Sequence, residues 1–326
     1  MRGGSNPASS DLASYTSTSM IEFNGVGYTY RSLVTRRHVR AVDDFTLSIA
    51  PGEVLGLAGP NGAGKTTLIA LMLGYLRPSD GDLRIDGQLP RSFVERHGVG
   101  YLSELVNIPP RWTVEQALVR FALLAGVADG ELRSRVDAAI EKMGIGEHRH
   151  KAVRQLSKGN AQRLGLAQAL LRPERVVVLD EPTHGLDPVW TQRFREIAAE
   201  LRRPDRVIFI ASHNLDELQR LADRVAIIDR GRLQRVVATR GGTTTDERRP
   251  HAPYLITVVR GAELVEEVFP GARARGRGEF ELPPSDLDTL NRGVAELVGR
   301  GALVTMLAPV HTALEQQFRE VVGEQT

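Results

Sequence analysis

Short apolar runs that end in glycine or charged residues recur through the first part of the chain. Residues 54–58 and 176–179 are uninterrupted runs of this kind, which is typical of strands buried on both faces of a parallel sheet. From about residue 105 to 156 the apolar positions take helical spacing, and Thr113 with Gln116 forms a candidate capping box. The pattern predicts an α/β domain with a mixed sheet core and a helical subdomain.

The character of the sequence changes near the end of this domain, for which we expect the bounds 20–238. Residues 239–253 are polar and rich in glycine and threonine, which predicts a linker. From 254 to 326, strand-like and helix-like stretches follow in the order βαββαβ with a closing helix. This order predicts a small α+β, ferredoxin-like accessory domain. Residues 1–19 are expected to form a disordered leader.

Composition narrows the class of protein. The chain has 326 residues, of which 41% are hydrophobic and 25% charged, enough for about two domains with buried cores. It contains no cysteine, which excludes disulfides and thiolate metal sites. No apolar run approaches the roughly 20 residues of a membrane helix. The net charge of +2, with both signs interspersed, predicts no nucleic-acid partner.

A phosphate-binding motif follows the apolar run at 54–58. It reads G-x-x-x-x-G-K-T and comprises Gly59, Pro60, Asn61, Gly62, Ala63, Gly64, Lys65, Thr66 and Thr67. Its glycines let the backbone wrap closely around a polyphosphate, and amides at the next helix start point at negative charge. In such a loop Lys65 reaches the β- and γ-phosphates and the Thr66 hydroxyl ligates Mg²⁺. The motif predicts a bound nucleoside triphosphate but does not choose among kinases, GTPases, helicases and transport ATPases.

Two acids end the apolar run at 176–179. Asp180 is placed to hold Mg²⁺, and Glu181 to orient and polarise the attacking water. The alternative is that both residues only begin the turn at Pro182. Two adjacent carboxylates at the end of a buried strand are costly without a cation or hydrogen-bond donors, so we favour the catalytic interpretation.

The segment Leu-Ser-Lys-Gly-Asn at residues 156–160 lies between these motifs. Here the chain resembles the ATP-binding subunits of ABC transporters, P-loop NTPases whose signature in this segment is Leu-Ser-Gly-Gly-Gln. Ser157 and Gly159 match the signature, whereas Lys158 and Asn160 depart from it. By its residues alone, the segment is most often a helix-capping loop with Ser157 at the N-cap. The resemblance implies that Ser157, Gly159 and Asn160 bind nucleotide.

Further positions match this family in order. The resemblance implies that Asp187 lies in the D-loop at the nucleotide, that His213 contacts the γ-phosphate and that Tyr30 stacks on adenine. From the residues alone, Asp187 is a helix N-cap and His213 a residue at a helix start. Tyr30 is then a strand aromatic, with Tyr28 placed on the other face of the strand. Glu104 stands where the family usually has a glutamine that ligates Mg²⁺, and a carboxylate can serve equally.

The resemblance implies an ATPase that binds ATP with Mg²⁺ and hydrolyses ATP through Lys65, Glu181 and His213. In this family the signature of one subunit caps the nucleotide of another, which implies a homodimer or a heterodimer with a homologous ATPase. It also implies a transmembrane permease subunit, a place at the cytoplasmic face of the cell membrane and, through Glu104, export. The alternative is a soluble ABC ATPase acting on ribosomes or DNA, and a third reading is a clamp that binds nucleotide without hydrolysis.

Overall fold

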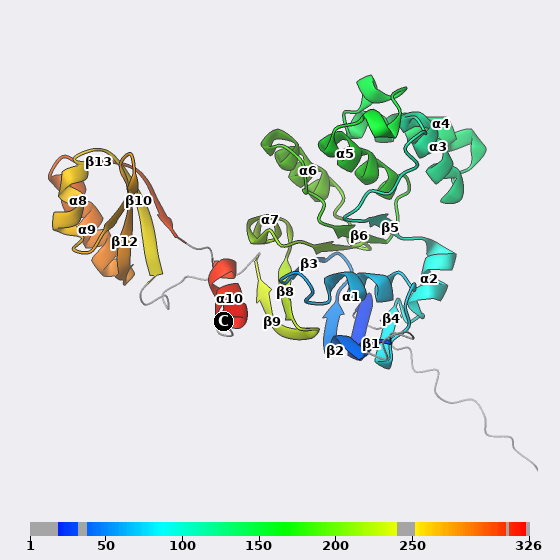
Figure 1. Cartoon of the computed structure of the whole chain (residues 1–326), viewed down its shortest axis with the longest axis horizontal. Coiled ribbons are helices and arrows are strands. Elements are labelled where there is room, and N and C mark those ends of the chain that lie inside the picture. Colours follow the sequence, from blue (N-terminus) through cyan, green and yellow to red (C-terminus); the bar gives the residue numbers. More distant parts are fainter. Residues whose placement is uncertain (1–18, 32–37, 240–251, 311–312, 324–326) are drawn as a thin grey trace, which may run out of the picture.

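The structure, a computed structural model, describes four stretches of the chain, residues 19–31, 38–239, 252–310 and 313–323 (Figure 1). Almost all of the leader expected at 1–19 and most of the linker expected at 239–253 lie outside the described residues. Within them the strands form a three-stranded, a six-stranded and a four-stranded sheet. The first two sheets belong to the amino-terminal domain, and the third to the carboxy-terminal part.

The three-stranded sheet is antiparallel. β1 (Ile21–Arg31) lies between β2 (His38–Ile49) and β4 (Asp80–Ile85). Along much of these strands buried and exposed side chains alternate, because successive side chains of a strand point to opposite faces. The sheet brings the end of β1, with Tyr30, beside α1 (Lys65–Met72), the helix that follows the phosphate-binding motif.

The six-stranded sheet forms the centre of the domain. Its strands lie in the order β5 (Gly100–Leu102), β6 (Val176–Asp180), β7 (Val207–Ala211), β3 (Val54–Ala58), β8 (Arg224–Asp229) and β9 (Arg232–Ala238). Neighbours are parallel except β8 and β9. All residues of β3, β6 and β7 are buried, and their apolar side chains divide between two cores on opposite faces. The carboxyl ends of these strands therefore share one sheet edge, where ligands of such folds bind.

Helices cover this sheet and build the helical subdomain (Figure 1). They are α2 (Pro90–His97), α3 (Val114–Leu124), α4 (Asp129–Lys142), α5 (Lys158–Ala169), α6 (Pro188–Glu200) and α7 (Leu215–Leu221), with short 3₁₀ turns at Gly146–His148 and Val153–Gln155. The predicted capping box is present, because Thr113 and Gln116 exchange side-chain to backbone hydrogen bonds, each of 3.1 Å. The mixed sheet with its helical subdomain confirms the predicted fold class.

The carboxy-terminal sheet has the order β11 (Arg273–Gly276), β12 (Glu279–Ser285), β10 (Ala252–Arg260) and β13 (Leu303–Pro309), and every neighbouring pair is antiparallel. A 3₁₀ turn (Ala262–Leu264) with α8 (Val265–Val268), and α9 (Leu287–Gly299), supply the helical elements. Ile256, Val258, Phe269, Leu290 and Leu297 are buried in its core. The order of elements is the βαββαβ order expected from the sequence.

The last helix, α10 (Ala313–Val322), leaves this sheet and returns to the first domain. It contacts α7 and β9, as the red helix of Figure 1 shows. Leu314 is 1% exposed and joins the apolar core of the first domain, and Arg235 pairs with Glu320 at 3.2 Å. The segment expected to form one accessory domain is thus divided between two packing partners. Among the described residues, no helix is long and apolar enough to span a membrane.

Candidate nucleotide-binding site

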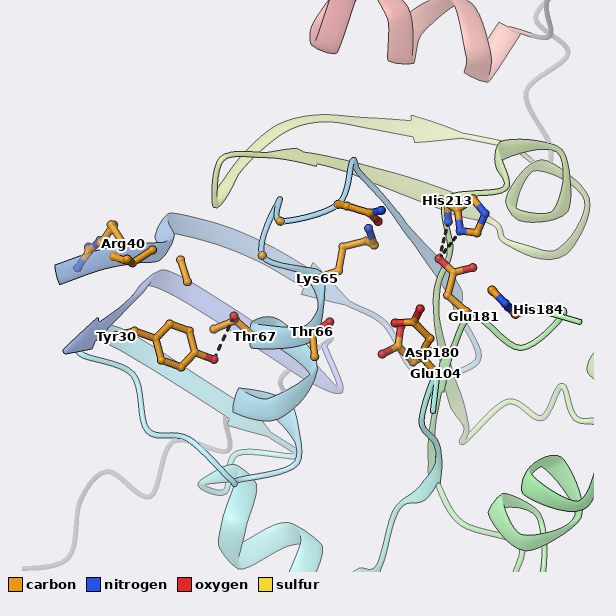
Figure 2. Close-up of a pocket in the computed structure, with 15 residues that line it drawn as sticks. Tyr30, Arg40, Lys65, Thr66, Thr67, Glu104, Asp180, Glu181, His184 and His213 are labelled. Atoms are coloured by element: carbon orange, nitrogen blue, oxygen red, sulfur yellow. Dashed lines mark hydrogen bonds and ion pairs between the residues drawn. The ribbon is translucent and has the colours of Figure 1, made fainter. Parts of the chain in front are cut away.

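A cavity of about 750 Å³ opens where β3, β6 and β7 end (Figure 2). This volume is in the usual range of small-molecule sites. Its lining comes from the phosphate-binding motif, the carboxyl edge of the six-stranded sheet and β1–β2, and consists of Tyr30, Val39, Arg40, Ala41, Asn61, Gly62, Gly64, Lys65, Thr66, Thr67, Glu104, Asp180, Glu181, His184 and His213. Val39, Arg40 and Ala41, near the start of β2, were not among the site residues expected from the sequence. His184 could have been found from its place in the D-loop.

The backbone of the phosphate-binding loop binds the side chain of its own lysine. Lys65 is 9% exposed, and its Nζ donates to the carbonyl oxygens of Gly59 at 2.7 Å and Pro60 at 3.2 Å. Gly64 has φ of 109°, and a Cβ there would lie 2.5 Å from the Ala41 oxygen, so the position requires glycine. A Cβ on Gly62 would meet no atom within 4 Å, so the space beside this residue is empty of protein atoms.

Burial lowers the pKa of the Lys65 ammonium, and the negative charges of Glu181, Asp180 and Glu104 oppose this change. Burial also raises the pKa of Asp180 to about 6, with Glu104 and Glu181 acting in the same direction and Lys65 against them. The cavity therefore gathers three carboxylates around one ammonium. Two of these carboxylates, Asp180 and Glu181, are buried, and such an excess of negative charge favours a further cation.

The donors beside Asp180 fit Mg²⁺. The Thr66 hydroxyl and the carboxylates of Asp180 and Glu104 are hard oxygen donors, and Figure 2 shows Asp180 next to Glu104. Within the described residues no group of three or more histidine, cysteine, aspartate or glutamate side chains could hold a metal by itself. In nucleotide sites Mg²⁺ takes most of its ligands from phosphates and water.

Glu181 is a buried carboxylate with three hydrogen-bond donors. Its Oε1 accepts from the backbone N–H of His213 at 2.8 Å and from the ring Nδ1 at 2.7 Å, and its Oε2 accepts from the Ser212 hydroxyl at 2.9 Å. Glu181 is 6% exposed and has φ of 48°, a left-handed conformation that costs a non-glycine residue about 1–3 kcal/mol. The sequence did not identify Ser212. Strain and three donors together give the carboxylate one orientation.

Of the two tyrosines of β1, only Tyr30 lines the cavity. It is 44% exposed, and its hydroxyl lies 3.4 Å from Oγ1 of Thr67. The expectation that Tyr28 lies on the opposite face is wrong, because the rings meet edge to face with centroids 4.8 Å apart. Residues two apart in a strand share a face. Tyr28 packs against the apolar core behind Tyr30.

The signature residues do not line this cavity. Ser157 is the N-cap of α5, and its Oγ accepts from the Asn160 N–H at 3.3 Å, while the Asn160 amide donates to Nε2 of His148 at 2.8 Å. Gly159 lies near the D-loop, and Lys158 hydrogen-bonds to His184 there. Asp187 is the N-cap of α6, with Oδ1 accepting from the Trp190 N–H at 2.9 Å. One chain therefore does not bring Ser157, Gly159, Asn160 or Asp187 to its own Lys65.

Comparison with known proteins identifies the family of this chain. The family model described as ABC transporter matches residues 42–184. The uncharacterized ABC transporter ATP-binding protein YdbJ of Bacillus subtilis is 32% identical over 282 residues, which cover 84% of this chain and 87% of that protein. The chain belongs to the ABC transporter ATP-binding proteins. It is accordingly an ATPase of the ABC type.

Other relatives of this ABC ATPase differ in their named direction of transport. The methionine import ATP-binding protein MetN 2 of Pseudomonas entomophila is 34% identical, covering 76% of this chain and 75% of that protein. The Nod factor export ATP-binding protein I of Paraburkholderia xenovorans is 36% identical, covering 59% and 64%. Across the first three curated relatives, the chain spans 57% to 87% of their length. The dimeric, ADP- and phosphate-bound structure of the ATP-binding cassette MJ0796 has a TM-score of 0.62 at 20% identity, covering 68% of this chain and all of that one, which shows the shared fold.

Proposed function

We propose that this chain is the ATP-hydrolysing subunit of a membrane transporter, and that it dimerises around two ATP molecules to move a substrate through a separate permease. The observation that carries the proposal is the incomplete site of the single chain. Lys65, Asp180 and Glu181 share one cavity, whereas Ser157 and Gly159 lie outside it. A second copy, or a homologous ATPase, supplies the missing face.

Each side chain has a chemical task in this proposal. The loop amides and Lys65 bind the phosphates, and Tyr30 stacks on adenine. Glu181 takes a proton from the water that attacks the γ-phosphate, which yields ADP and inorganic phosphate. The ring of His213 holds the Glu181 carboxylate in place through Nδ1. The exposed edge of the same ring contacts the γ-phosphate. Thr66, Asp180 and Glu104 would hold Mg²⁺, which neutralises charge on the phosphates.

In the partner subunit's site, Ser157, Gly159, Asn160 and Asp187 would contact the nucleotide from the opposite face. Export is the direction we favour, from Glu104 at the usual glutamine position, and import is the competing outcome. The proposed location is the cytoplasmic face of the cell membrane. Tyr75 and Leu105, 72% and 79% exposed, offer apolar surface for contact with a permease.

The decisive test is to trap the dimer. Glu181→Gln removes the proton acceptor but keeps the side-chain shape, so ATP with Mg²⁺ should convert the variant from monomer to a long-lived dimer, measured by size exclusion with light scattering. Lys65→Ala should bind ATP weakly and remain monomeric. Hydrolysis by Glu181→Gln at the parent rate would remove Glu181 from this role.

A purification experiment distinguishes the transporter from the soluble alternative. The tagged chain is isolated from its native membranes in a mild detergent, and its stoichiometric partners are identified. A polytopic membrane protein supports the transporter proposal and identifies the permease. Ribosomes or DNA without such a protein would favour a soluble ABC ATPase instead.

A further inference from the structure

Gln162 is a buried polar side chain with no role in the mechanism above. It lies on α5, the helix that begins at the signature, and is 4% exposed. Its Nε2 donates to the carbonyl oxygen of Glu181 at 3.0 Å and to that of Pro182 at 3.2 Å. One side-chain amide therefore holds two consecutive carbonyls of the segment that carries the general base.

The peptide that Gln162 holds has an unfavourable backbone. Glu181 has φ of 48°, and it precedes a proline, where an extended backbone with negative φ is preferred. On the amino side, the Glu181 N–H donates to the carbonyl of Ala211 at 2.8 Å. On the carboxyl side, the Glu181 carbonyl accepts from the backbone N–H of His184 at 3.1 Å and from Gln162, whose amide also holds the Pro182 carbonyl. Loss of the Gln162 amide leaves the Glu181 carbonyl with the contact to His184 inside the turn, so the strained peptide can relax and turn the carboxylate away from Ser212 and His213.

We propose that Gln162 is a positioning residue for ATP hydrolysis, holding the Glu181 peptide so that the carboxylate faces the attacking water. The inference rests on the proposed function of Glu181 as the general base. It also defines a route between the two sites of a dimer. Ser157, at the start of α5, would meet the partner's nucleotide, while Gln162 on the same helix holds the base of its own site. A shift of α5 is therefore transmitted to Glu181 by direct hydrogen bonds.

A simpler role predicts a different result. If Gln162 only satisfies two buried carbonyls for folding, its loss lowers the melting temperature. It then lowers the rate of hydrolysis by the same factor in the parent and in the Glu181→Gln variant. If it acts through Glu181, its loss lowers kcat with little change in KM and has no further effect once Glu181 is replaced. A double-mutant cycle separates these cases, because residues that act as a unit are not additive.

The experiment compares Gln162→Met, which keeps the volume and removes both donors, with Gln168→Met on the half-buried side of the same helix. We expect Gln162→Met to lower kcat by about 10- to 100-fold, equivalent to about 1.4–2.8 kcal/mol, with KM and the ATP dissociation constant changed by less than about threefold. Gln168→Met should keep the parent kcat. In the Glu181→Gln background, single-turnover hydrolysis should be the same with and without Gln162→Met.

Gln162→Glu provides a second variant, since it keeps the shape but turns acceptor oxygens toward the two carbonyls, and it should lower kcat at least as much as Gln162→Met. Folding of each variant is checked by its melting curve and its ATP affinity. A parent kcat in a folded Gln162 variant, or an equal loss in both backgrounds, would overturn the inference. If the parent chain itself does not hydrolyse ATP in this assay, the proposed function fails instead, so the two failures are distinguishable.

Discussion

Nδ1 of His213 lies 2.7 Å from Oε1 of Glu181, and the backbone N–H of the same histidine donates to the same oxygen at 2.8 Å. A carboxylate oxygen accepts, so Nδ1 carries the ring proton. The histidine side chain is nevertheless 64% exposed, while that of Glu181 is 8% exposed. His213 thus holds the buried Glu181 carboxylate through its backbone N–H and Nδ1, while the rest of its ring is exposed in the cavity.

This relationship predicts the effect of His213→Ala. The variant keeps the backbone donor but loses the ring, so Glu181 is held less firmly and the γ-phosphate loses one contact. We expect kcat to fall by about 100-fold with a small change in ATP affinity, measured in steady-state assays and by nucleotide titration. His150→Ala is the matched control, because this histidine side chain is 81% exposed and lies outside the cavity lining. Equal activity of both variants would contradict the role of His213.

Replacing Tyr30 should mainly change the affinity for ATP, whereas replacing Tyr28 should mainly change the melting temperature. Tyr30→Ala should weaken ATP binding by at least about tenfold, since stacking of a base on an aromatic ring contributes about 1–3 kcal/mol. Tyr30→Phe keeps the ring and should bind almost normally. Tyr28→Ala should lower the melting temperature more than the ATP affinity, because Tyr28 packs on the apolar core. Fluorescence titration and thermal melts of the three variants check this order, and a larger affinity loss in Tyr28→Ala would contradict it.

The raised pKa of Asp180 predicts that Asp180→Asn stabilises the ligand-free protein. The pKa of this acid is about 6 in the fold against an ordinary value of 3.8, so the native state binds protons more tightly and loses stability as pH rises from about 4 to 6. Above that window the penalty is constant, on the order of 3 kcal/mol. Melting in the presence of a chelator should therefore favour Asp180→Asn more at pH 8 than at pH 5. The exposed Glu141→Gln serves as control, and an advantage that grows toward acid pH would refute the prediction.

Replacing Glu104 should change the pH range over which Mg²⁺-dependent hydrolysis occurs. After burial, Glu104 is the largest contributor to the raised pKa of Asp180, so Glu104→Gln should lower that pKa. The acid limb of the kcat/KM profile for Mg²⁺-ATP should then move to lower pH. Assays between pH 5 and 8 for the parent and the variant test the direction. A limb that stays in place or moves to higher pH would contradict the prediction.

The last helix should be released by a single truncation of its buried side chain. Leu314 is 1% exposed against the first domain, and Leu314→Ala should weaken the docking of α10 by about 2–3 kcal/mol. Hydrogen exchange of the α10 amides should accelerate, while ATP affinity stays near that of the parent. Val298→Ala on α9, 55% exposed, should leave this exchange unchanged. Unaltered protection of α10 in Leu314→Ala would mean that Leu314 does not hold the helix.

Features with local causes were predictable from the sequence. A cap depends on residues three positions apart, so the capping box at Thr113 and the N-caps Ser157 and Asp187 were recognisable and are present. The face of Tyr28 was also a local matter, and the error there was one of strand period rather than of missing information. Gln162 gave no signal, because its importance comes from carbonyls almost twenty positions away.

By itself, the sequence determined the chemistry of this protein: a loop whose glycines can enclose phosphate, a lysine within it, and two acids at the end of a buried strand. The tertiary structure decided which of these residues meet. Parallel pairing of β3, β6 and β7 places Lys65, Asp180, Glu181 and His213 at one sheet edge, and the direction of α5 keeps the signature away from that cavity. It also decided that α10 packs on α7, because an amphipathic helix specifies that it must bury one face but not against which surface.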